Sequence, residues 1–407
     1  MRCNRLCNMP ETLLLTDAPA TSASLANYEV AMDARWLHTG LGTYTYNLLK
    51  ALSTSQNGVR LRAVVSQENA GRVSAFCQSL RIVESPIYTI REQFEIPKAA
   101  RGCDLLHVPH YNAPLLYPGK LVVSIHDLIH LMPEGNNRQL SVFAYAWTML
   151  HLAARRADHI VTGSAHAKQE IVERLGVPGS KISVIYHGVS QDFQDSNRET
   201  APAVVYSALG RQFPYMLCVS ALRPHKNLAR LLEAAHRFWE RTHSNCELLI
   251  VGTGGPEKAQ LLDQCGRLGI AGKVTFLADV AEGLLPFLYA AAQFLVIPSL
   301  MEGFGLPVLE AMACGTPVLC SNTSSLPEVG GQAVLYFDPL NPEEMANAMQ
   351  TLSASPEMRA ALREKGLQRA QNFSWHESAR KHAEVYSEVL HPARTTVSGF
   401  GSSHARN

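Results

Sequence analysis

Two glutamates and two glycines stand together in the second half of the sequence. Glu302 and Glu310 are eight residues apart, and Gly303 and Gly305 flank Phe304 between them. Glycines in such a stretch let backbone N–H groups approach a ligand, because no Cβ stands in the way. Carboxylates accept hydrogen bonds from ligand hydroxyls. We therefore expect Glu302 and Glu310 to face the same ligand cleft.

The segment around these residues predicts a strand, a loop and a helix. Residues 294–298 form a short apolar run ending in proline, which is typical of a strand buried on both faces of a parallel sheet. Residues 299–306 then form the loop at its carboxyl end, where open α/β sheets bind ligands. Pro307 suits the first turn of a helix running to about Ala313, whose positive end points at the loop. The alternative is an ordinary α/β connection in which Glu310 is a solvated surface charge.

A second candidate loop carries basic side chains. A buried strand begins at Tyr215, and Arg223 and Lys226 follow it, just before an amphipathic helix. Two cations before a helix N-terminus predict a diphosphate site, because the side chains and the helix dipole act on the same anion. The alternative is that both are solvated loop charges.

A histidine and an aspartate follow a strand in the first half. His126 and Asp127 come directly after the apolar run 121–125, on the ligand side of a parallel sheet. A histidine there can relay a proton or hold a sugar hydroxyl. The alternative is a structural pair whose imidazole is held by a backbone carbonyl. Three further histidines are interpreted as structural: His107, His110 and His130.

Near the start of the first half, residues 39–42 (TGLG) interrupt a strand and a helix. Gly40 and Gly42 predict either a phosphate-binding loop or a tight turn between the two elements. Local sequence does not separate these two possibilities.

Taken together, these segments resemble the retaining glycosyltransferases of family 4, also called glycosyl transferases group 1. Glu302 and Glu310 match the E-x7-E spacing of that family, His126 and Asp127 match its His-Asp-Leu segment, and Lys226 and Asn227 match its basic cluster. The matching segments extend from about residue 28 to residue 390. Four positions depart from the family pattern: Thr43 and His225 replace arginines, and Ser220 and Ala278 replace glycines.

The resemblance implies the GT-B fold, an α/β architecture of two Rossmann-like parallel-sheet domains facing each other across a cleft. It implies that Glu302 binds the donor sugar, that Glu310 binds the ribose, and that His126 lies near the reacting carbon. The implied catalytic residues are His126, Lys226 and Glu302. The implied donor-binding residues are Gly40, Gly42, Arg223, Lys226, Asn227, Leu277, Val280, Glu302, Gly303, Phe304, Gly305, Leu306 and Glu310.

The implied reaction moves a hexose from a nucleoside diphosphate sugar to a hydroxyl of a glycan or lipid-linked acceptor, with retention of configuration. The sequence looks nearest to bacterial mannosyltransferases of cell-surface polysaccharide or glycolipid assembly, which favours GDP-mannose, and UDP-glucose stays open as a donor. No cofactor or metal is expected, because the resemblance implies a family whose enzymes generally need no metal. The alternative is an inactive nucleotide-sugar-binding protein, but intact Glu302, Glu310, Lys226 and His126 argue against it. No cofactor lysine or paired catalytic carboxylates of other GT-B enzymes are found.

The length of 407 residues suggests two domains, joined by a polar linker at residues 190–212. The expected parts are a flexible N-terminal extension at 1–27, an acceptor-side domain at 28–199, a donor domain at 200–372, a terminal helix at 373–390 that crosses back to the first domain, and a mobile tail at 391–407.

A formal net charge of +1 gives no general attraction to nucleic acid. Nine cysteines without a C-x-x-C pair, mostly in apolar runs, predict free thiols and a cytoplasmic location, which could include the inner face of the membrane. The apolar helix expected at 141–157 ends in two arginines. We interpret it as core packing, since apolar residues occur all round it, and keep peripheral membrane contact as the alternative.

Overall fold

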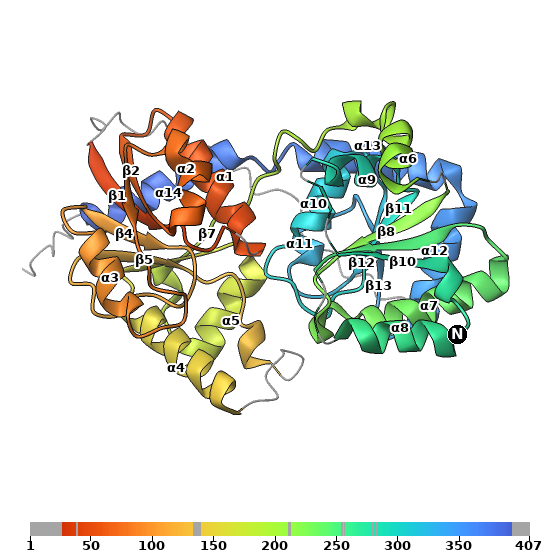
Figure 1. Cartoon of the computed structure of the whole chain (residues 1–407), viewed down its shortest axis with the longest axis horizontal. Helices are drawn as coiled ribbons and strands as arrows, with labels where there is room; N and C mark the ends of the chain where they lie inside the picture. The colour runs from red at the N-terminus through yellow and green to blue at the C-terminus, as the bar shows by residue number, and fades with distance from the viewer. Residues whose placement is uncertain are drawn as a thin grey trace, which may run out of the picture.

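The computed structural model describes residues 27–37, 40–132, 140–210, 213–253, 255, 257–278, 280–281 and 283–392. These residues form two α/β domains, each built on one parallel sheet with helices on both faces (Figure 1). The predicted N-terminal extension and C-terminal tail lie almost entirely outside the described residues.

The first domain contains a seven-stranded sheet with the order β3-β2-β1-β4-β5-β6-β7, in which all neighbours pair in parallel. The strand order reverses between β1 and β4, and ligands of open α/β sheets bind at such a point. The strands are β1 Tyr28–Asp33, β2 Val59–Val65, β3 Ser79–Ile82, β4 Leu105–Val108, β5 Lys120–Ser124, β6 His159–Thr162 and β7 Ile182–Val184.

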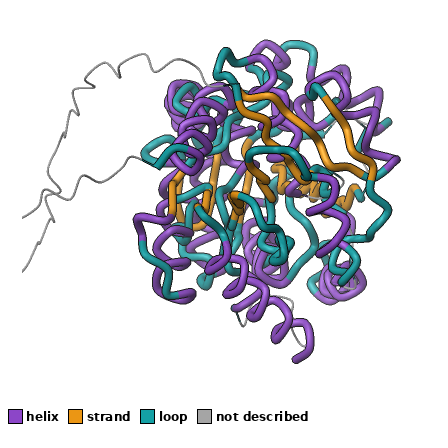
Figure 2. The backbone as a smooth tube through the Cα atoms, turned by 90° about the vertical axis from the view of Figure 1, so that its left-hand side faces the viewer, coloured by secondary structure: helices purple, strands orange, loops and turns teal. Residues whose placement is uncertain are grey.

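Helices cover both faces of this sheet, and Figure 2 shows them on both sides of the strands. One apolar core joins the sheet to α1 and the other joins it to α3, α4 and α5. The helices are α1 Gly40–Thr54, α2 Ala70–Val73, α3 Glu92–Ala99, α4 Leu140–Arg156 and α5 Ala165–Leu175.

The second domain repeats the same plan with six parallel strands in the order β10-β9-β8-β11-β12-β13. Its order reverses between β8 and β11, so both halves have a reversal point of the kind at which open α/β sheets bind ligands. The strands are β8 Tyr215–Val219, β9 Glu247–Val251, β10 Val274–Leu277, β11 Phe294–Ile297, β12 Val318–Ser321 and β13 Leu335–Phe337. The helices are α6 Ala201–Leu209, α7 Leu228–Thr242, α8 Glu257–Arg267, α9 Leu285–Ala291, α10 Leu306–Ala313, α11 Leu326–Gly330, α12 Pro342–Ala354 and α13 Pro356–Ala370.

The prediction of a polar linker at residues 190–212 is wrong in one respect, because this segment contains helix α6 and a short 3-10 turn. Ala201 and Val205 of α6 are buried in the core of the second domain. The helix ends at Gly210, which adopts a left-handed conformation with φ 70°. The two buried residues stand four positions apart, as the inward face of a helix requires, so α6 belongs to the second domain rather than to a linker.

The chain crosses between the domains a second time near its end. Helix α14, Trp375–Leu390, packs against α1 of the first domain, and Tyr28 donates a hydrogen bond to the Ala383 carbonyl at 2.9 Å. The two crossings touch, because a Cβ on Gly188 would lie 2.0 Å from the backbone nitrogen of Trp375. A residue larger than glycine at position 188 would therefore push the crossings apart.

The core-packing interpretation of α4 is wrong for the outward face of that helix. The buried residues are Ala146, Met149, Leu150, Ala153 and Ala154, whereas six other apolar side chains on the same helix are exposed. The buried residues recur at the three- and four-residue spacing of one helix face, and that face alone is covered. No helix in the described part of the chain is long and apolar enough to cross a bilayer.

The predicted free thiols are present wherever the structure describes a cysteine. These are Cys77, Cys103, Cys218, Cys246, Cys265, Cys314 and Cys320, and Cys3 and Cys7 lie outside the described residues.

Candidate active site

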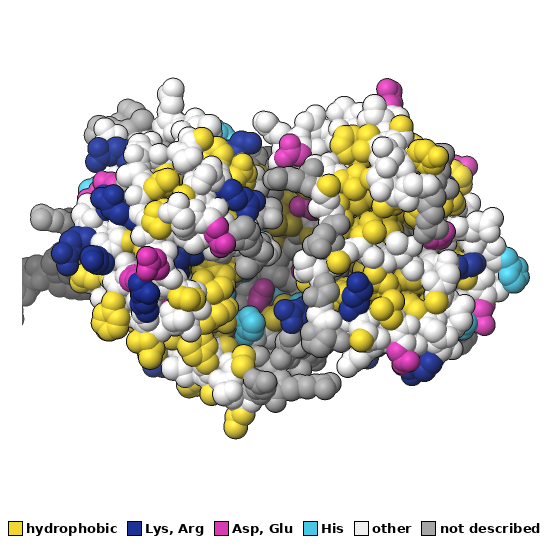
Figure 3. Space-filling model, in the orientation of Figure 1, with side chains coloured by type: hydrophobic (Ala, Val, Ile, Leu, Met, Phe, Trp, Pro, Cys, Tyr) yellow, Lys and Arg dark blue, Asp and Glu magenta, His cyan; other side chains and the backbone are white. Residues whose placement is uncertain are grey.

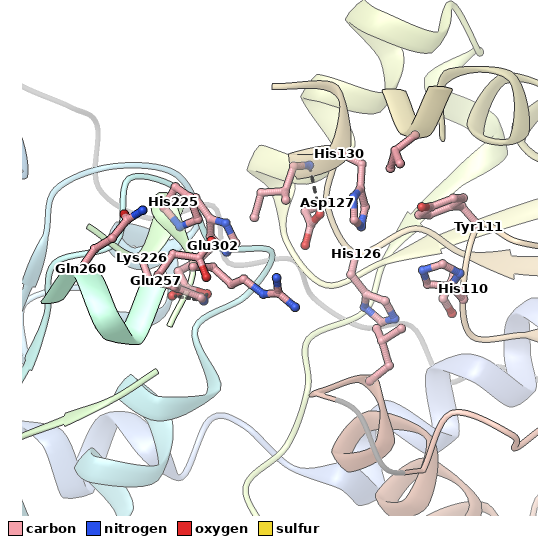
Figure 4. Close-up of a pocket in the computed structure, with 16 residues that line it drawn as sticks. His110, Tyr111, His126, Asp127, His130, His225, Lys226, Glu257, Gln260 and Glu302 are labelled. Carbon is pink, nitrogen blue, oxygen red and sulfur yellow. Dashed lines mark hydrogen bonds and ion pairs between the residues drawn. The ribbon is translucent and has the colours of Figure 1, made fainter. Parts of the chain in front are cut away.

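A cavity of about 760 Å³ lies between the two domains, and residues from both line it (Figure 4). The hollow between the halves is visible on the molecular surface, with basic and histidine side chains at its edge (Figure 3). The first domain contributes Leu41, Ser124, His126, Asp127, Ile129, Val142, His110, Tyr111 and His130. The second contributes Arg223, Pro224, His225, Lys226, Glu257, Gln260 and Glu302.

Strand ends position these side chains. His110 follows β4 and His126 follows β5 in the first sheet, while Arg223 follows β8 and Glu302 follows β11 in the second. All four lie at the carboxyl edges of the sheets, close to the points where the strand orders reverse. The fold therefore brings the predicted basic loop, the glutamate loop and the histidine to one cavity.

Lys226 and Glu302 form an ion pair at the wall of the second domain. The Nζ atom of Lys226 lies 2.7 Å from each carboxylate oxygen of Glu302, and Ser299 donates a hydrogen bond to Oε1 at 2.6 Å. The side chains are only 18% and 11% exposed. A diphosphate at Lys226 and a sugar hydroxyl at Glu302 would thus meet adjacent, opposite charges.

The glutamate loop is shaped by glycines and held by serines. Gly305 directly precedes helix α10 and has φ 105°. A side chain at this position would strain the backbone. A Cβ on Gly303 would lie 2.6 Å from the carbonyl oxygen of His126, so this loop touches the first domain directly. Ser164 of the first domain donates to the Gly303 carbonyl at 2.9 Å. The predicted close approach at these glycines is to the protein itself.

His126 presents an unprotonated ring nitrogen in its neutral form. Its Nε2 lies 3.2 Å from the carbonyl oxygen of Pro109, which only accepts, so the hydrogen is assigned to Nε2. Burial lowers the pKa of His126, and the neighbouring Asp127 opposes that effect. At neutral pH the Nδ1 atom is therefore an acceptor.

A chain of buried hydrogen bonds fixes the ring that packs against His126. Tyr44 contacts His126 edge to face at 4.6 Å, and its hydroxyl lies 2.9 Å from Ser124 Oγ and 2.8 Å from His382 Nε2. His382 Nδ1 donates to the Ser378 carbonyl, so Tyr44 must donate to Nε2.

The same reasoning assigns the donors and acceptors in the rest of this hydrogen-bond network. Ser124 then donates to Tyr44 and accepts from His107 Nε2, which leaves His107 Nδ1 to accept from Tyr386. Burial lowers the pKa of His107 well below its usual range and that of His382 to about 4, so both rings are neutral. The structural interpretation of His107 agrees with these contacts, whereas His110 and His130 line the cavity.

Asn227 is buried in the loop rather than open to the cavity. Its amide donates to the carbonyls of Pro298 and Pro339 at 3.0 and 2.8 Å, and its oxygen accepts from Arg230. It adopts φ 59° at the start of α7. Its side chain therefore joins the two ligand loops, and contact with a donor would require breaking these bonds.

Of the two glutamates expected to face one cleft, only Glu302 lines this cavity. Glu302 lines the cavity, but Glu310 is 9% exposed and does not, because its position on α10 turns it toward α9. Tyr289 donates to its Oε2 at 2.9 Å, and burial raises the pKa of Glu310 to about 7. It is not a solvated surface charge either.

The remaining predicted donor residues do not line this cavity. The loop expected at Gly40 and Gly42 is the first turn of α1, and a Cβ on Gly42 would lie 2.2 Å from the Leu37 carbonyl oxygen, so this glycine serves tight packing. Phe304 is buried against His187 at 4.6 Å. Three others are half-buried or at strand and helix ends: Leu277, Val280 and Leu306.

The sequence did not single out several residues that the fold brings to the site. Glu257 and Gln260 line the cavity from the start of α8, and Tyr111 lines it after β4. The sequence feature that could have predicted them is their position after strand ends, because ligand-binding side chains collect there. Among the residues that the structure describes, no group of three or more His, Cys, Asp or Glu is placed to hold a metal ion.

Two family matches cover most of the chain. Residues 38–193 match Glycosyltransferase Family 4, and residues 207–369 match Glycosyl transferases group 1. The boundary between the matches falls between the two sheets.

Two related proteins are named as O-antigen chain mannosyltransferases. O-antigen chain mannosyltransferase B of Escherichia coli is 30% identical over 370 residues, which are 86% of this chain and 96% of that protein. The O-antigen chain mannosyltransferase RfbU of Salmonella typhimurium is 30% identical over 256 residues, 62% of this chain and 66% of that protein.

Solved structures share the fold at low identity. Sucrose-phosphate synthase from Thermosynechococcus elongatus superimposes with a TM-score of 0.75 at 20% identity, covering 89% of this chain and 99% of that one. The Anabaena protein HepE in complex with UDP and glucose gives 0.74 at 19% identity, covering 89% and 100%. The predicted two-domain GT-B fold is thereby confirmed, and the chain belongs to the glycosyl transferases group 1, glycosyltransferase family 4.

Proposed function

We propose that this glycosyltransferase moves mannose from GDP-mannose to a hydroxyl of a glycan or lipid-linked acceptor, with retention, during assembly of a cell-surface polysaccharide or glycolipid. The observation that carries the proposal is the Lys226–Glu302 pair facing His126 across one interdomain cavity. The choice of mannose is supported by the two relatives named O-antigen chain mannosyltransferases.

In the proposed reaction, the donor diphosphate lies at Arg223 and Lys226, close to the N-terminus of α10. The bond between the anomeric carbon and the phosphate oxygen breaks, and its electron pair leaves with the diphosphate. The acceptor oxygen bonds to the same face of that carbon, and its proton passes to the departing phosphate oxygen. The two cations stabilise the charge that develops on the diphosphate.

The sugar would lie between Glu302 and His126. Glu302 accepts hydrogen bonds from sugar hydroxyls, and the Nδ1 atom of His126 accepts another. Binding from both domains would fix the anomeric carbon relative to the acceptor, which is the positioning that such a displacement requires.

The test is a panel of nucleotide sugars, including GDP-mannose and UDP-glucose, incubated with purified protein and with glycan and lipid-linked acceptors. Release of nucleoside diphosphate is followed, and the anomeric configuration of the product is read by NMR. We expect release with GDP-mannose and an α-linked product. An inverted product would reject retention, and release with UDP-glucose alone would reject the donor.

An inactive nucleotide-sugar-binding protein is the alternative. Calorimetry would then show donor binding while no donor gives release with any acceptor. That combination would reject the transferase proposal.

A further inference from the structure

The outward face of α4 exposes large apolar side chains. Leu140 is 81% exposed, Phe143 36% and Trp147 49%, and they share one face of the helix because they lie three and four residues apart. Val142, Tyr145 and Leu152 lie on another side of the helix and are 39% to 43% exposed. Scattered exposed apolar residues are normal, but three large ones on one face of a projecting helix form a patch that marks an interaction surface.

The shape and charge of this helix restrict what can bind there. Every residue from Leu140 to Tyr145 is exposed, so the first turns project beyond the body of the domain, as Figure 1 shows for α4. The helix carries no Asp or Glu, and Arg155 and Arg156 end it. Arg156 bonds to the Gly119 carbonyl at 2.8 Å, which leaves Arg155 as the exposed cation of the helix.

The face adjoins the cavity between the domains. Val142 lines that cavity, and Tyr145 donates a hydrogen bond to Asn112, two residues beyond His110 of the cavity wall. The apolar surface therefore begins at the edge of the candidate active site.

We propose that this face of α4 inserts into the interfacial layer of a lipid bilayer. A single projecting helix offers no groove for a protein segment, but it can enter between head groups. Trp and Tyr favour the boundary between apolar and aqueous layers, and the lack of acidic residues avoids repulsion by anionic lipids. Since the exposed cation is single, apolar contact supplies most of the affinity.

One consequence rests on the proposed function. With α4 at the membrane, the cavity edge at Val142 lies next to the bilayer surface, where the hydroxyl of a lipid-linked acceptor would be presented. The binding itself is independent of catalysis, so it is tested without any substrate.

The chain contains a built-in reporter for this test. Of its four tryptophans, Trp36, Trp239 and Trp375 are 3%, 5% and 8% exposed, whereas Trp147 faces solvent. Full-length protein is titrated with phosphatidylcholine vesicles, with and without phosphatidylglycerol, and followed by tryptophan emission and co-sedimentation. We expect a blue shift and co-sedimentation with both vesicle types. Trp147→Phe should lose the shift while still sedimenting.

A matched pair of double variants distinguishes vesicle binding by this face from nonspecific vesicle binding. Leu140→Ser with Phe143→Ser should lower the partition coefficient about tenfold or more. Leu262→Ser with Leu340→Ser changes two leucines of the second domain that are 49% and 61% exposed, and should leave it unchanged. All four positions are exposed, so thermal unfolding serves to show that both variants fold.

Three outcomes would overturn the proposal. These are no vesicle binding by the parent protein, an equal loss in both double variants, and concentration-dependent dimerisation without vesicle binding that the Leu140/Phe143 variant abolishes. The last outcome would assign the face to a second copy of the chain. None of them would bear on whether the enzyme transfers mannose.

Discussion

The ammonium group of Lys226 lies 2.7 Å from both carboxylate oxygens of Glu302, although the two residues are on different loops of the second domain. Both side chains are largely shielded from water. Removing either partner therefore leaves a poorly solvated charge, which costs more than the loss of an exposed ion pair. The pair would keep the proposed diphosphate and sugar positions in a fixed relation before the donor binds.

Replacing Lys226 with alanine should lower kcat/KM for the donor by about 10²–10³, because a stabilising donor to the leaving group is lost. Steady-state assays of nucleoside diphosphate release measure the effect. Lys365→Ala, on the exposed side of α13, is the control and should behave like the parent. A Lys226→Ala variant with unchanged kcat/KM would remove Lys226 from the proposed mechanism.

Tyr44→Phe should lower kcat for transfer while donor KM changes little. The ring still packs on His126, but the hydroxyl that bonds Ser124 and His382 is gone, so His126 loses a fixed neighbour. We also expect a loss of about 1–3 kcal/mol in unfolding free energy, since buried groups lose their partner. Tyr46→Phe on the same helix is the control. Loss of stability with full kcat would limit Tyr44 to a structural role.

If the donor ribose binds at Glu310, as the family resemblance implies, donor binding should weaken as the pH falls below about 7, where this carboxyl becomes protonated. Burial raises the pKa of this carboxyl, and only the ionised form accepts hydrogen bonds through both oxygens. Glu310→Gln should raise donor KM about tenfold, alter kcat less, and abolish this pH dependence. Calorimetric titrations between pH 6 and 8 test it. An unchanged pH profile in the variant, with exposed Glu364→Gln as control, would contradict the assignment.

Acid should destabilise the protein partly through His382. Burial lowers its pKa to about 4, so below the usual value of 6.5 the unfolded chain binds a proton that the folded protein does not. Stability is therefore complete above pH 6.5 and declines toward pH 4, by about 3 kcal/mol for this group. Urea unfolding at both pH values measures the decline.

His382→Gln should flatten that decline, whereas His376→Gln, exposed on the same helix, should not. Equal slopes in the parent and the His382 variant would show that other groups govern acid sensitivity.

Chelation should leave turnover unchanged. The proposed stabilisation of the leaving diphosphate comes from Arg223 and Lys226, so EDTA treatment followed by dialysis should retain full activity. Restoration of lost activity by added Mg²⁺ or Mn²⁺ would show that a cation takes part in the reaction.

The short apolar runs, which alternate with helical segments, were sufficient to predict the parallel sheets. A run such as 294–298 has few interpretations other than a buried strand. They also placed His126, Lys226 and Glu302 at strand ends. Local pattern could not predict the burial of Glu310, since its partner Tyr289 lies 21 residues away on another helix. A glutamate inside a short helix has the same local pattern whether it faces solvent or a tyrosine.

Other features also depend on residues that are far apart in the sequence, so local pattern could not predict them. Asn227 bonds to Pro298 and Pro339, which are 71 and 112 residues away. Helix α4 looked like core because apolar residues surround it, but only one of its faces is covered by the rest of the domain. Which face of such a helix is covered depends on what the rest of the chain supplies.

The touching crossings at Gly188 and Trp375 have a mechanical consequence. Because both connections between the domains pass through one place, we expect the domains to rotate relative to each other about that contact. His187, stacked on Trp375 at 5.7 Å, lies beside the contact and should move least. Parts of the cleft further from the contact should move in proportion to their distance. The separation of the two reactants would then depend on rotation about this one contact.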